Sequence, residues 1–481
     1  MFKLTPLTAA ILVIVSAQAL ANDSLSTQDQ TGTANVADVK QTLSPFSTAT
    51  QQQLGQGNDA AAKQDTATST IDQNQVGDYN AGYAEQLFEN NSTITQQQTG
   101  SFNTSHASQS IGAGGGEVLQ QQQGTGNFSF VYQDSQDGTT GQTFQFGDSN
   151  EAYIEQIQPG IANTAVIIQY GTTNYATAEQ INHMGGRIDI NQTGTSNYAY
   201  GDQRNGDGGN LTINQLGDGN GTEIWQDGQV GSGATVNQTG LTNETVVDQS
   251  FGENNTAHVF QVGDLNAIYA DQFESTGSTI ALYQTGTGNT HFTYQTGEGH
   301  SLTATSVGTD NKVYASNWKG PQKGGQFGSN QSATITQNGK ENIANFTQDG
   351  VGHIMTTHQT GTGNKTTVSQ AENYNELYFD QNGSDNVLIA DQRGTANLIE
   401  GSSTGMNNST AFDQSGTGNL ASTSQWGNDN QITVKQADTM NVAYVTQGGT
   451  GNIANVDQSG VTQMATIQQV GMDNRATVLQ Q

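Results

Sequence analysis

The stretch that decides the fold is residues 145–156, with the sequence QFGDSNEAYIEQ. Gly147 and Asn150 form a turn, because both residue types tolerate left-handed backbone angles. Behind the turn the side chains alternate with a period of two, and one face carries Asn150, Ala152, Ile154 and Gln156. Alternation of this kind with a turn on each side predicts a short β-strand.

The same motif, Gln-x-Gly-x-x-Asn with another Gln eleven positions after the first, recurs from Gln30 to Gln480. Between Gln30 and Gln295 the full unit is about 23 residues, and from Gln337 to Gln480 it is 22 residues made of two near-equal halves. Ser403 replaces one glutamine of the second series. A pattern of fixed short period over nearly the whole mature chain indicates a repeat architecture.

Strand, turn, strand and turn make one coil, so the sequence predicts an all-β fold, a parallel β-solenoid of two facing parallel sheets. It has about 22–23 residues per coil and roughly twenty coils. With strands about 4.8 Å apart, the rod is on the order of 100 Å long and resembles the cross-β arrangement of amyloid. Small apolar residues and amides point between the sheets, and stacked amides form hydrogen-bonded ladders along the rod. The predicted assembly ladders include Gln30, Asn35, Gln41, Gln75, Asn80, Gln86, Gln145, Asn150, Gln156, Gln447, Asn452, Gln458, Gln469, Asn474 and Gln480.

The composition agrees with a thin, regular core. Only 32% of the residues are hydrophobic, which is too little for an ordinary globular core in a chain of 481 residues. A formal net charge of -30 disfavours nucleic acid and anionic membranes as partners, because they carry the same sign of charge. The absence of cysteine excludes disulfides and thiolate metal sites.

The chain divides into five segments. Residues 1–21 are predicted to be a secretory signal peptide, with Lys3 before a short apolar run and a small-residue cleavage site before Asn22, so no membrane span is expected after its removal. A short N-terminal segment, 22–29, precedes repeats of the 23-residue period at 30–305 and of the 22-residue period at 327–481. Between them, residues 306–326 form an irregular seam, in which Ser306 and Asn317 stand where glutamines are expected.

Aromatic residues recur three positions after the turn asparagine and predict an outward column. Its members include Tyr83, Tyr153, Tyr200, Tyr269, Tyr378 and Tyr444. One interpretation is surface β-propensity with stacking along the rod. The other is a column for lateral association or for adhesion to glycans or surfaces.

Acidic residues recur just before the closing glutamine, as at Glu85, Glu155, Asp271 and Asp457. Calcium binding by this carboxylate column is one interpretation, although the spacing lacks the Gly-Gly-x-Gly-x-Asp pattern of calcium-binding β-rolls. We favour the other, that the acids are charges that oppose premature stacking. The seven histidines are scattered, and no nucleophile–base set, nucleotide loop or carboxylate pair stands out from the repeat. No catalytic, metal or cofactor-binding residue is therefore predicted.

The repeat resembles that of the curlins, Ser-x5-Gln-x-Gly-x2-Asn-x-Ala-x3-Gln. Closely matching units are Gln145, Gly147, Asn150, Ala152 and Gln156; Gln192, Gly194, Asn197, Ala199 and Gln203; and Gln447, Gly449, Asn452, Ala454 and Gln458. The resemblance implies a secreted subunit of curli, the functional amyloid fibres of bacterial biofilms, on the surface of a Gram-negative-type bacterium. It also implies a related nucleator subunit and curli export and chaperone proteins as partners. In that family the amides of the outer repeats drive assembly, and Gln30, Asn35, Gln41, Gln469, Asn474 and Gln480 match them here.

The sequence thus predicts a non-enzymatic fibre subunit whose main partner is itself, assembling end to end by strand templating. One alternative is a monomeric surface β-solenoid adhesin that binds glycan or ice. It requires flat outward arrays and capped ends, whereas the motif runs to Gln480. A polysaccharide-cleaving β-helix enzyme is a further alternative, and it requires a cluster of acids out of register with the repeat.

Overall fold

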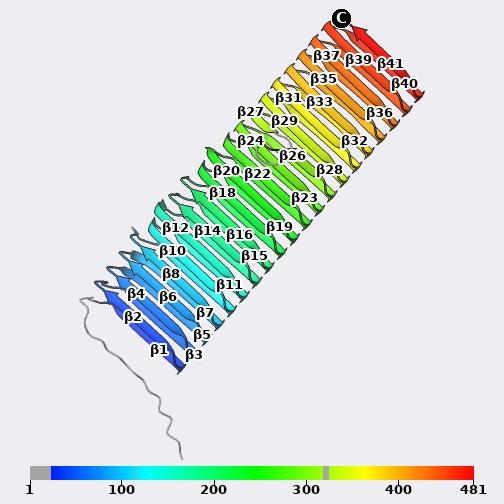
Figure 1. Ribbon diagram of the computed structural model, residues 1–481. Coiled ribbons are helices and arrows are strands. Elements are labelled where there is room, and N and C mark those ends of the chain that lie inside the picture. Colours follow the sequence, from blue (N-terminus) through cyan, green and yellow to red (C-terminus); the bar gives the residue numbers. More distant parts are fainter. Residues whose placement is uncertain (1–22, 113, 318–323) are drawn as a thin grey trace, which may run out of the picture.

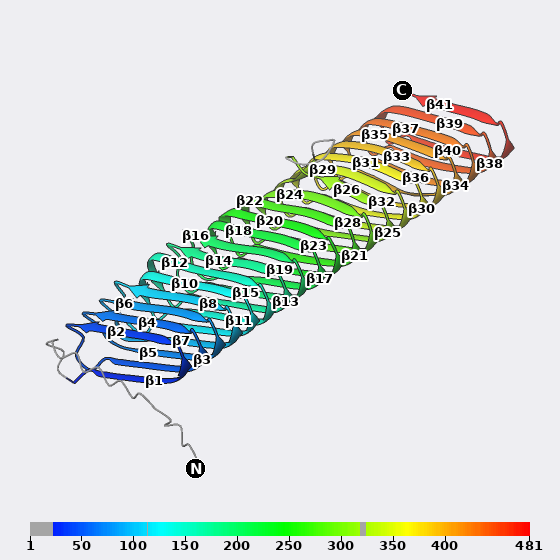
Figure 2. The ribbon, with the colours of Figure 1, turned by 60° about the horizontal axis from the view of Figure 1, so that its bottom comes forward.

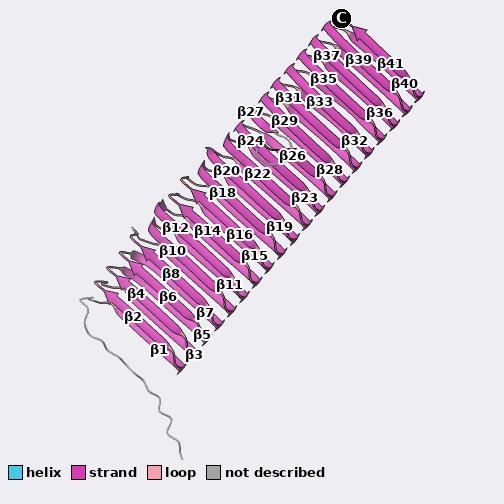
Figure 3. Cartoon of the chain, viewed as in Figure 1, coloured by secondary structure: helices cyan, strands magenta, loops and turns pink. Residues whose placement is uncertain are grey.

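A computed structural model describes residues 23–112, 114–317 and 324–481 of the chain. The predicted signal peptide and Trp318–Lys323 of the seam lie outside the described residues. Within these ranges every regular element is a β-strand (Figure 3). The strands stack into one long rod with β1 and β41 at opposite ends (Figures 1 and 2).

Sheet A contains 20 strands. They are β1 (Leu25–Thr33), β3 (Thr48–Gln56), β5 (Thr68–Asp78), β7 (Asn90–Ser101), β9 (Glu117–Thr125), β11 (Thr140–Asp148), β13 (Thr164–Thr172), β15 (Arg187–Thr195), β17 (Asn210–Asp218), β19 (Gly233–Leu241), β21 (Thr256–Asp264), β23 (Thr279–Thr287), β25 (Ser301–Thr309), β28 (Ser332–Lys340), β30 (Ile354–Thr362), β32 (Glu376–Ser384), β34 (Leu398–Met406), β36 (Leu420–Asn428), β38 (Val442–Thr450) and β40 (Met464–Met472).

Sheet B faces sheet A and is formed by the intervening strands. They are β2 (Val36–Thr42), β4 (Asp59–Asp65), β6 (Ala81–Leu87), β8 (Thr104–Ser110), β10 (Phe128–Asp137), β12 (Glu151–Ile161), β14 (Tyr175–Ile181), β16 (Tyr198–Arg204), β18 (Gly221–Val230), β20 (Glu244–Glu253), β22 (Ala267–Thr276), β24 (Thr290–Glu298), β26 (Lys312–Ala315), β27 (Gly325–Ser329), β29 (Ile343–Val351), β31 (Lys365–Asn373), β33 (Val387–Thr395), β35 (Ser409–Thr417), β37 (Gln431–Thr439), β39 (Ile453–Val461) and β41 (Arg475–Gln480).

Every strand pairs in parallel with the strand one coil further along, and equivalent residues face each other. In sheet A, Gln169 of β13 is in register with Gln192 of β15, and in sheet B Gln156 of β12 is in register with Gln180 of β14. The prediction of a two-sheet parallel β-solenoid of about twenty coils is therefore confirmed. At about 4.8 Å per coil the rod is on the order of 100 Å long.

The core is a thin layer between the sheets. In β15, Ile188, Ile190 and Gln192 point inward and are fully buried, while β16 contributes Ala199. Fully burying an aliphatic side chain stabilises the fold by about 1.5–3 kcal/mol, so each coil is held by a few such residues together with its backbone hydrogen bonds. Buried amides at the edges of this layer must find partners inside the rod, because water does not reach them.

The seam interrupts one rung of sheet B without breaking the stack. β26 and β27 together occupy the rung between β24 and β29. Gln326 stands in register with Gln295 and Gln348, so it, and not Asn317, takes the glutamine position of this rung. Additional residues between Ala315 and Gly325 displace the expected glutamine along the sequence, and simple counting from the previous rung therefore points to the wrong residue.

Candidate functional site

Two columns of glutamine, one per sheet, run along the rod. In sheet A, Gln145 Nε2 donates to Gln169 Oε1 at 2.9 Å, and in sheet B, Gln156 Nε2 donates to Gln180 Oε1 at 2.8 Å. Gln145 Nε2 also donates to the backbone oxygen of Phe128, which belongs to the facing sheet, at 2.8 Å. Gln145 therefore ties its coil to the next one and sheet A to sheet B.

The structure places every predicted glutamine in one of these columns. Gln30, Gln75, Gln145, Gln447 and Gln469 lie in sheet A, and Gln41, Gln86, Gln156, Gln458 and Gln480 lie in sheet B. The columns continue to both ends: Gln30 donates to Gln53 at 2.7 Å and Gln41 to Gln64 at 2.8 Å, while Gln447 donates to Gln469 at 2.8 Å and Gln458 to Gln480 at 2.7 Å.

A third ladder follows the corner at which the chain passes from sheet A to sheet B. Asn80 donates its backbone N–H to Asn58 Oδ1 at 3.0 Å and its side-chain Nδ2 to the same oxygen at 3.1 Å. Its Nδ2 also donates to the backbone oxygen of Gly100 at 2.9 Å. The predicted residues of this corner ladder are Asn35, Asn80, Asn150, Asn452 and Asn474, and all five take part in it.

The opposite corner, from sheet B to sheet A, is mixed. Asn163, Ser232, Asn255 and Ser278 hold it in the first part of the rod, where the longer repeat unit places its extra residues. Asparagines hold it in the last part, and His353 accepts the Asn375 backbone N–H at Nδ1 there. The alternating spacing of the first repeats therefore reflects one variable corner and one constant corner.

Two serines interrupt the glutamine column of sheet A, and a side chain from sheet B compensates for each. His291 Nε2 lies 2.8 Å from Ser306 Oγ, which donates to Gln337 Oε1 at 2.8 Å. Ser403 Oγ lies 3.3 Å from Thr410 Oγ1 and donates to Gln425 Oε1 at 3.0 Å. Burial lowers the pKa of His291 to about 3, so this histidine is neutral in the core.

An additional glutamine column in the N-terminal coils was not predicted. Gln28, Gln51, Gln73, Gln96 and Gln120 form it, each donating to the next at 2.7–2.9 Å. They lie two residues before the main column, on the same inward face, where most later coils of the rod carry an apolar residue such as Ile167, Ile190 or Val236. The sequence signal for this column is a second glutamine two residues before that of the main column, as at Gln51 before Gln53 and at Gln96 before Gln98.

The six tyrosines predicted as one column lie on two opposite faces. Tyr83, Tyr153, Tyr200 and Tyr269 are in sheet B, whereas Tyr378 and Tyr444 are in sheet A. The turns before the first four lead from sheet A to sheet B, and those before the last two lead from sheet B to sheet A. On sheet B, Tyr83, His106 and Phe130 stack in successive coils, with ring centroids 4.7 and 5.1 Å apart.

Acidic residues before the closing glutamine are partly neutralised. Lys63 pairs with Glu85, Arg204 with both Glu179 and Asp202, and Arg393 with both Asp391 and Asp413. Asp248 and Asp271 occupy adjacent rungs of sheet B. Burial, and secondly the charge of Asp248, raise the pKa of Asp271 to about 7.

Asp271 makes the stability of the rod depend on pH. An aspartate in the unfolded chain has a pKa of about 3.9, so between about pH 4 and 7 the folded chain retains a proton that the unfolded chain has lost. Stability therefore falls as the pH rises through this window and stays low above it. Asp271→Asn is expected to raise the free energy of unfolding by on the order of 2 kcal/mol at about pH 8 and by little at about pH 4.

Denaturant unfolding of freshly purified monomer at the two pH values measures this difference. The control is Asp457→Asn, an exposed position of the same column. An Asp271→Asn variant whose stabilisation does not change with pH would contradict the assignment.

The two ends of the rod present unpaired ladder atoms. Among the described residues, no strand pairs with the outer edges of β1 and β2 or of β40 and β41. The direction of the ladders leaves the Oε1 atoms of Gln30 and Gln41 facing outward at the first coil. The Nε2 atom of Gln469, the ladder N–H of Gln480 and the Oδ1 atom of Asn474 face outward at the last coil.

No arrangement for metal binding occurs in residues 23–112, 114–317 and 324–481, where no group of three or more His, Cys, Asp or Glu side chains could hold a metal ion. Over the same ranges, the structure contains no helix long and apolar enough to cross a membrane.

The fold and the ladders define a parallel β-solenoid whose coils are joined by side-chain amides. Residues 187–217 match the family model of the curlin associated repeat, which confirms the resemblance to the curlin repeat family. The matched segment spans β15, β16 and most of β17 and includes Gln192, Gly194, Asn197, Ala199 and Gln203. The comparison with curated proteins found no match to the chain.

Proposed function

We propose that this protein is a structural subunit of extracellular curli-like amyloid fibres. It is secreted, forms a fimbrium on the cell surface, and supports biofilm matrix and cell adhesion without catalysing a reaction. Copies of the chain are its main partner, joined end to end. The curlin repeat at residues 187–217 supports the fibre class, and the complementary end faces of the rod support this mode of assembly.

The end faces carry the proposal because each presents the atoms that the other lacks. A second copy stacked on the last coil would place its Gln30 and Gln41 oxygens opposite the N–H groups of Gln469 and Gln480. It would also place the N–H of its Asn35 opposite Asn474 Oδ1. These are the contacts that each internal coil already makes, as between Gln447 and Gln469, so the joint would repeat the interior of the rod.

Strand pairing would continue across the same joint. Ile453 in β39 donates its backbone N–H to the oxygen of Asn474 in the last coil, at 2.8 Å. Arg475 is the equivalent of Ile453 one coil later, so its N–H points to the open end and would meet the next copy. Exposed strand edges of this kind template the addition of further strands.

A nucleator subunit and export and chaperone proteins complete the proposal by analogy with curli. A nucleator would need to present one end face with the same two glutamine columns and one asparagine ladder. Such a surface would remove the need for the first two free chains to meet in register, which is the slow step of templated assembly.

The experiment is to incubate the mature chain and follow thioflavin fluorescence, electron microscopy and fibre diffraction. We expect unbranched fibres with a meridional reflection at about 4.8 Å. A chain that stays monomeric at high concentration would overturn the fibre function and favour the monomeric adhesin.

A variant with added charge at one end face distinguishes end-to-end joining from other modes of association. The double variant Gln469→Glu/Gln480→Glu keeps the oxygens that accept from Gln447 and Gln458. It loses the donors that face the next copy, together with one exposed hydrogen bond within the chain, from Gln480 Nε2 to the backbone oxygen of Met464. We expect a folded monomer whose fibre elongation is slowed about a hundredfold, because buried unpaired carboxylates would oppose each joint. The matched control, Gln468→Glu/Gln481→Glu, adds the same charge at exposed outward positions and should elongate normally. Equal elongation of both variants would exclude this joint.

A further inference from the structure

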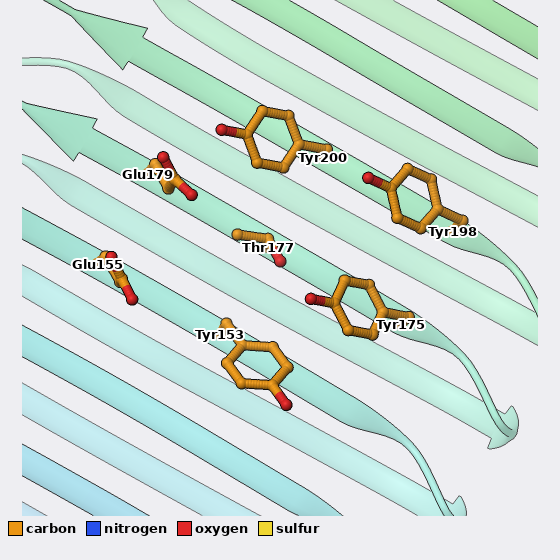
Figure 4. A pocket seen from close by; sticks show the side chains of 7 residues that line it. All are labelled: Tyr153, Glu155, Tyr175, Thr177, Glu179, Tyr198 and Tyr200. Carbon is orange, nitrogen blue, oxygen red and sulfur yellow. The ribbon is translucent and has the colours of Figure 1, made fainter.

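A groove crosses the outer face of sheet B near the middle of its first half. It has a volume of about 420 Å³ and is lined by Tyr153 and Glu155 of β12, Tyr175, Thr177 and Glu179 of β14, and Tyr198 and Tyr200 of β16 (Figure 4). The groove is on the flank of the rod, so ligand binding there does not depend on the fibre function proposed above.

The groove exists because one rung of an aromatic column carries a small residue. Tyr153, Thr177 and Tyr200 occupy the same position in three successive coils, and Thr177 leaves a gap between two rings. Beside this gap, Tyr175 and Tyr198 stack with centroids 5.7 Å apart and an interplanar angle of 10°. Tyr153 tilts toward Tyr175 at 5.4 Å. The side chains of four tyrosines therefore surround a space at the level of Thr177.

Carboxylates line the other side of the gap, as Figure 4 shows for Glu155 and Glu179. Arg204 pairs with Glu179 and Asp202, and among the described residues no ion pair reaches Glu155. Burial, and secondly the charge of Glu179, raise the pKa of Glu155. Arg204 offsets the charge of Glu179, which leaves Glu155 as the half-buried carboxylate of the groove without an ion-pair partner. A cation bound beside Glu155 would stabilise its charge.

We propose that this groove binds an organic ammonium ion, with the charged nitrogen beside Glu155 and Glu179 and its carbon substituents against the tyrosine rings. Aromatic rings attract cations through the negative faces of their π-systems, and the attraction increases where water is partly excluded. The formal net charge of -30 also concentrates cations near the surface of the rod. A neutral sugar would stack on the same rings and would leave the charge of Glu155 without a counter-ion.

Choline is the probe. The matched control ligand is 3,3-dimethylbutan-1-ol, in which an uncharged carbon replaces the charged nitrogen of choline. Titration calorimetry on the soluble mature chain should show saturable binding of choline and binding of dimethylbutanol weaker by about tenfold or more. A methyl glucoside forms a third arm. Equal binding of the isostere, preferential binding of the glucoside, or no saturable choline binding would each overturn the proposal.

Two variants test whether choline binds in the groove. Thr177→Tyr continues the aromatic column, fills the gap and should abolish choline binding, while Glu155→Gln leaves the shape intact and should weaken it about threefold to tenfold. Thr212→Tyr, on the outer face of β17 in sheet A, is the control for an added surface tyrosine and should bind choline normally. Unchanged binding in both groove variants would show that the choline site lies elsewhere.

Discussion

Gly194→Ala is expected to lower the free energy of unfolding by about 4 kcal/mol or more, which is enough to prevent most chains from folding. Gly194 adopts a φ of +127°, a backbone conformation that residues with a side chain rarely adopt. An added Cβ would lie 2.0 Å from the backbone oxygen of Gly217 in the next coil, and 2.8 Å from the carbon of that carbonyl. Neither atom can move without separating the two coils, because both belong to the paired backbone.

Gly221→Ala is the matched control for this experiment. Gly221 lies in β18, and an added Cβ there meets nothing within 4 Å. We expect this variant to be as stable as the parent or slightly more stable, since alanine restricts the unfolded chain. Denaturant unfolding followed by far-ultraviolet circular dichroism measures both variants. Equal stability of the two would show that the coil spacing at the glycine column is not fixed by backbone contact.

Asn197→Asp is expected to lower the free energy of unfolding by about 3–5 kcal/mol at neutral pH. Asn197 Nδ2 donates to Asn174 Oδ1 at 3.0 Å and to the backbone oxygen of Gly217 at 2.7 Å. An aspartate of the same shape has no N–H groups, so its buried carboxylate would face two oxygens. Its pKa would be raised in the folded state, and the loss should therefore diminish as the pH falls toward and below that pKa.

The control for this variant lies six positions earlier in the same coil. Asn191 forms a ladder on the outer face of sheet A, donating to Asn214 Oδ1 at 2.9 Å, and its side chain reaches solvent. Asn191→Asp makes the same chemical change and should cost well under 1 kcal/mol, because water can solvate the carboxylate. Thermal or denaturant unfolding at two pH values distinguishes the pair. An equal loss of unfolding free energy in the two variants would show that the side-chain amides of the corner ladder contribute little to stability and that the backbone hydrogen bonds hold this corner.

The sequence was sufficient for the solenoid because its signal is redundant. Most coils repeat the Gly and Asn turn residues, the inward apolar residues and the closing glutamine, so single departures such as Ser306 and Ser403 do not hide the period. The compensating partners His291 and Thr410 could not be predicted, because they come from the facing sheet and depend on how the two sheets are offset. The curlin repeat was recognised for the same reason as the solenoid, from the spacing of Gln192, Gly194, Asn197 and Gln203.

Assignments to a face of the rod were harder to predict. The position of a tyrosine relative to its turn asparagine fixes that it points outward, but not whether the turn leads into sheet A or sheet B. Tyr378 and Tyr444 consequently lie opposite Tyr153, although all three follow the same local pattern. Gln326 shows the related difficulty at the seam, where inserted residues change the count and leave the three-dimensional register unaltered.

The ladders of the rod point in opposite senses. In the glutamine columns each coil donates to the following coil, as from Gln145 to Gln169, whereas in the corner ladder each asparagine donates to the preceding one, as from Asn80 to Asn58. The side-chain dipoles therefore largely oppose one another, unlike the aligned peptide dipoles of an α-helix. Ladders of opposite sense leave smaller partial charges at the two ends of the rod than ladders of a single sense would leave. These partial charges arise from the terminal amides alone, so they do not change with the number of coils.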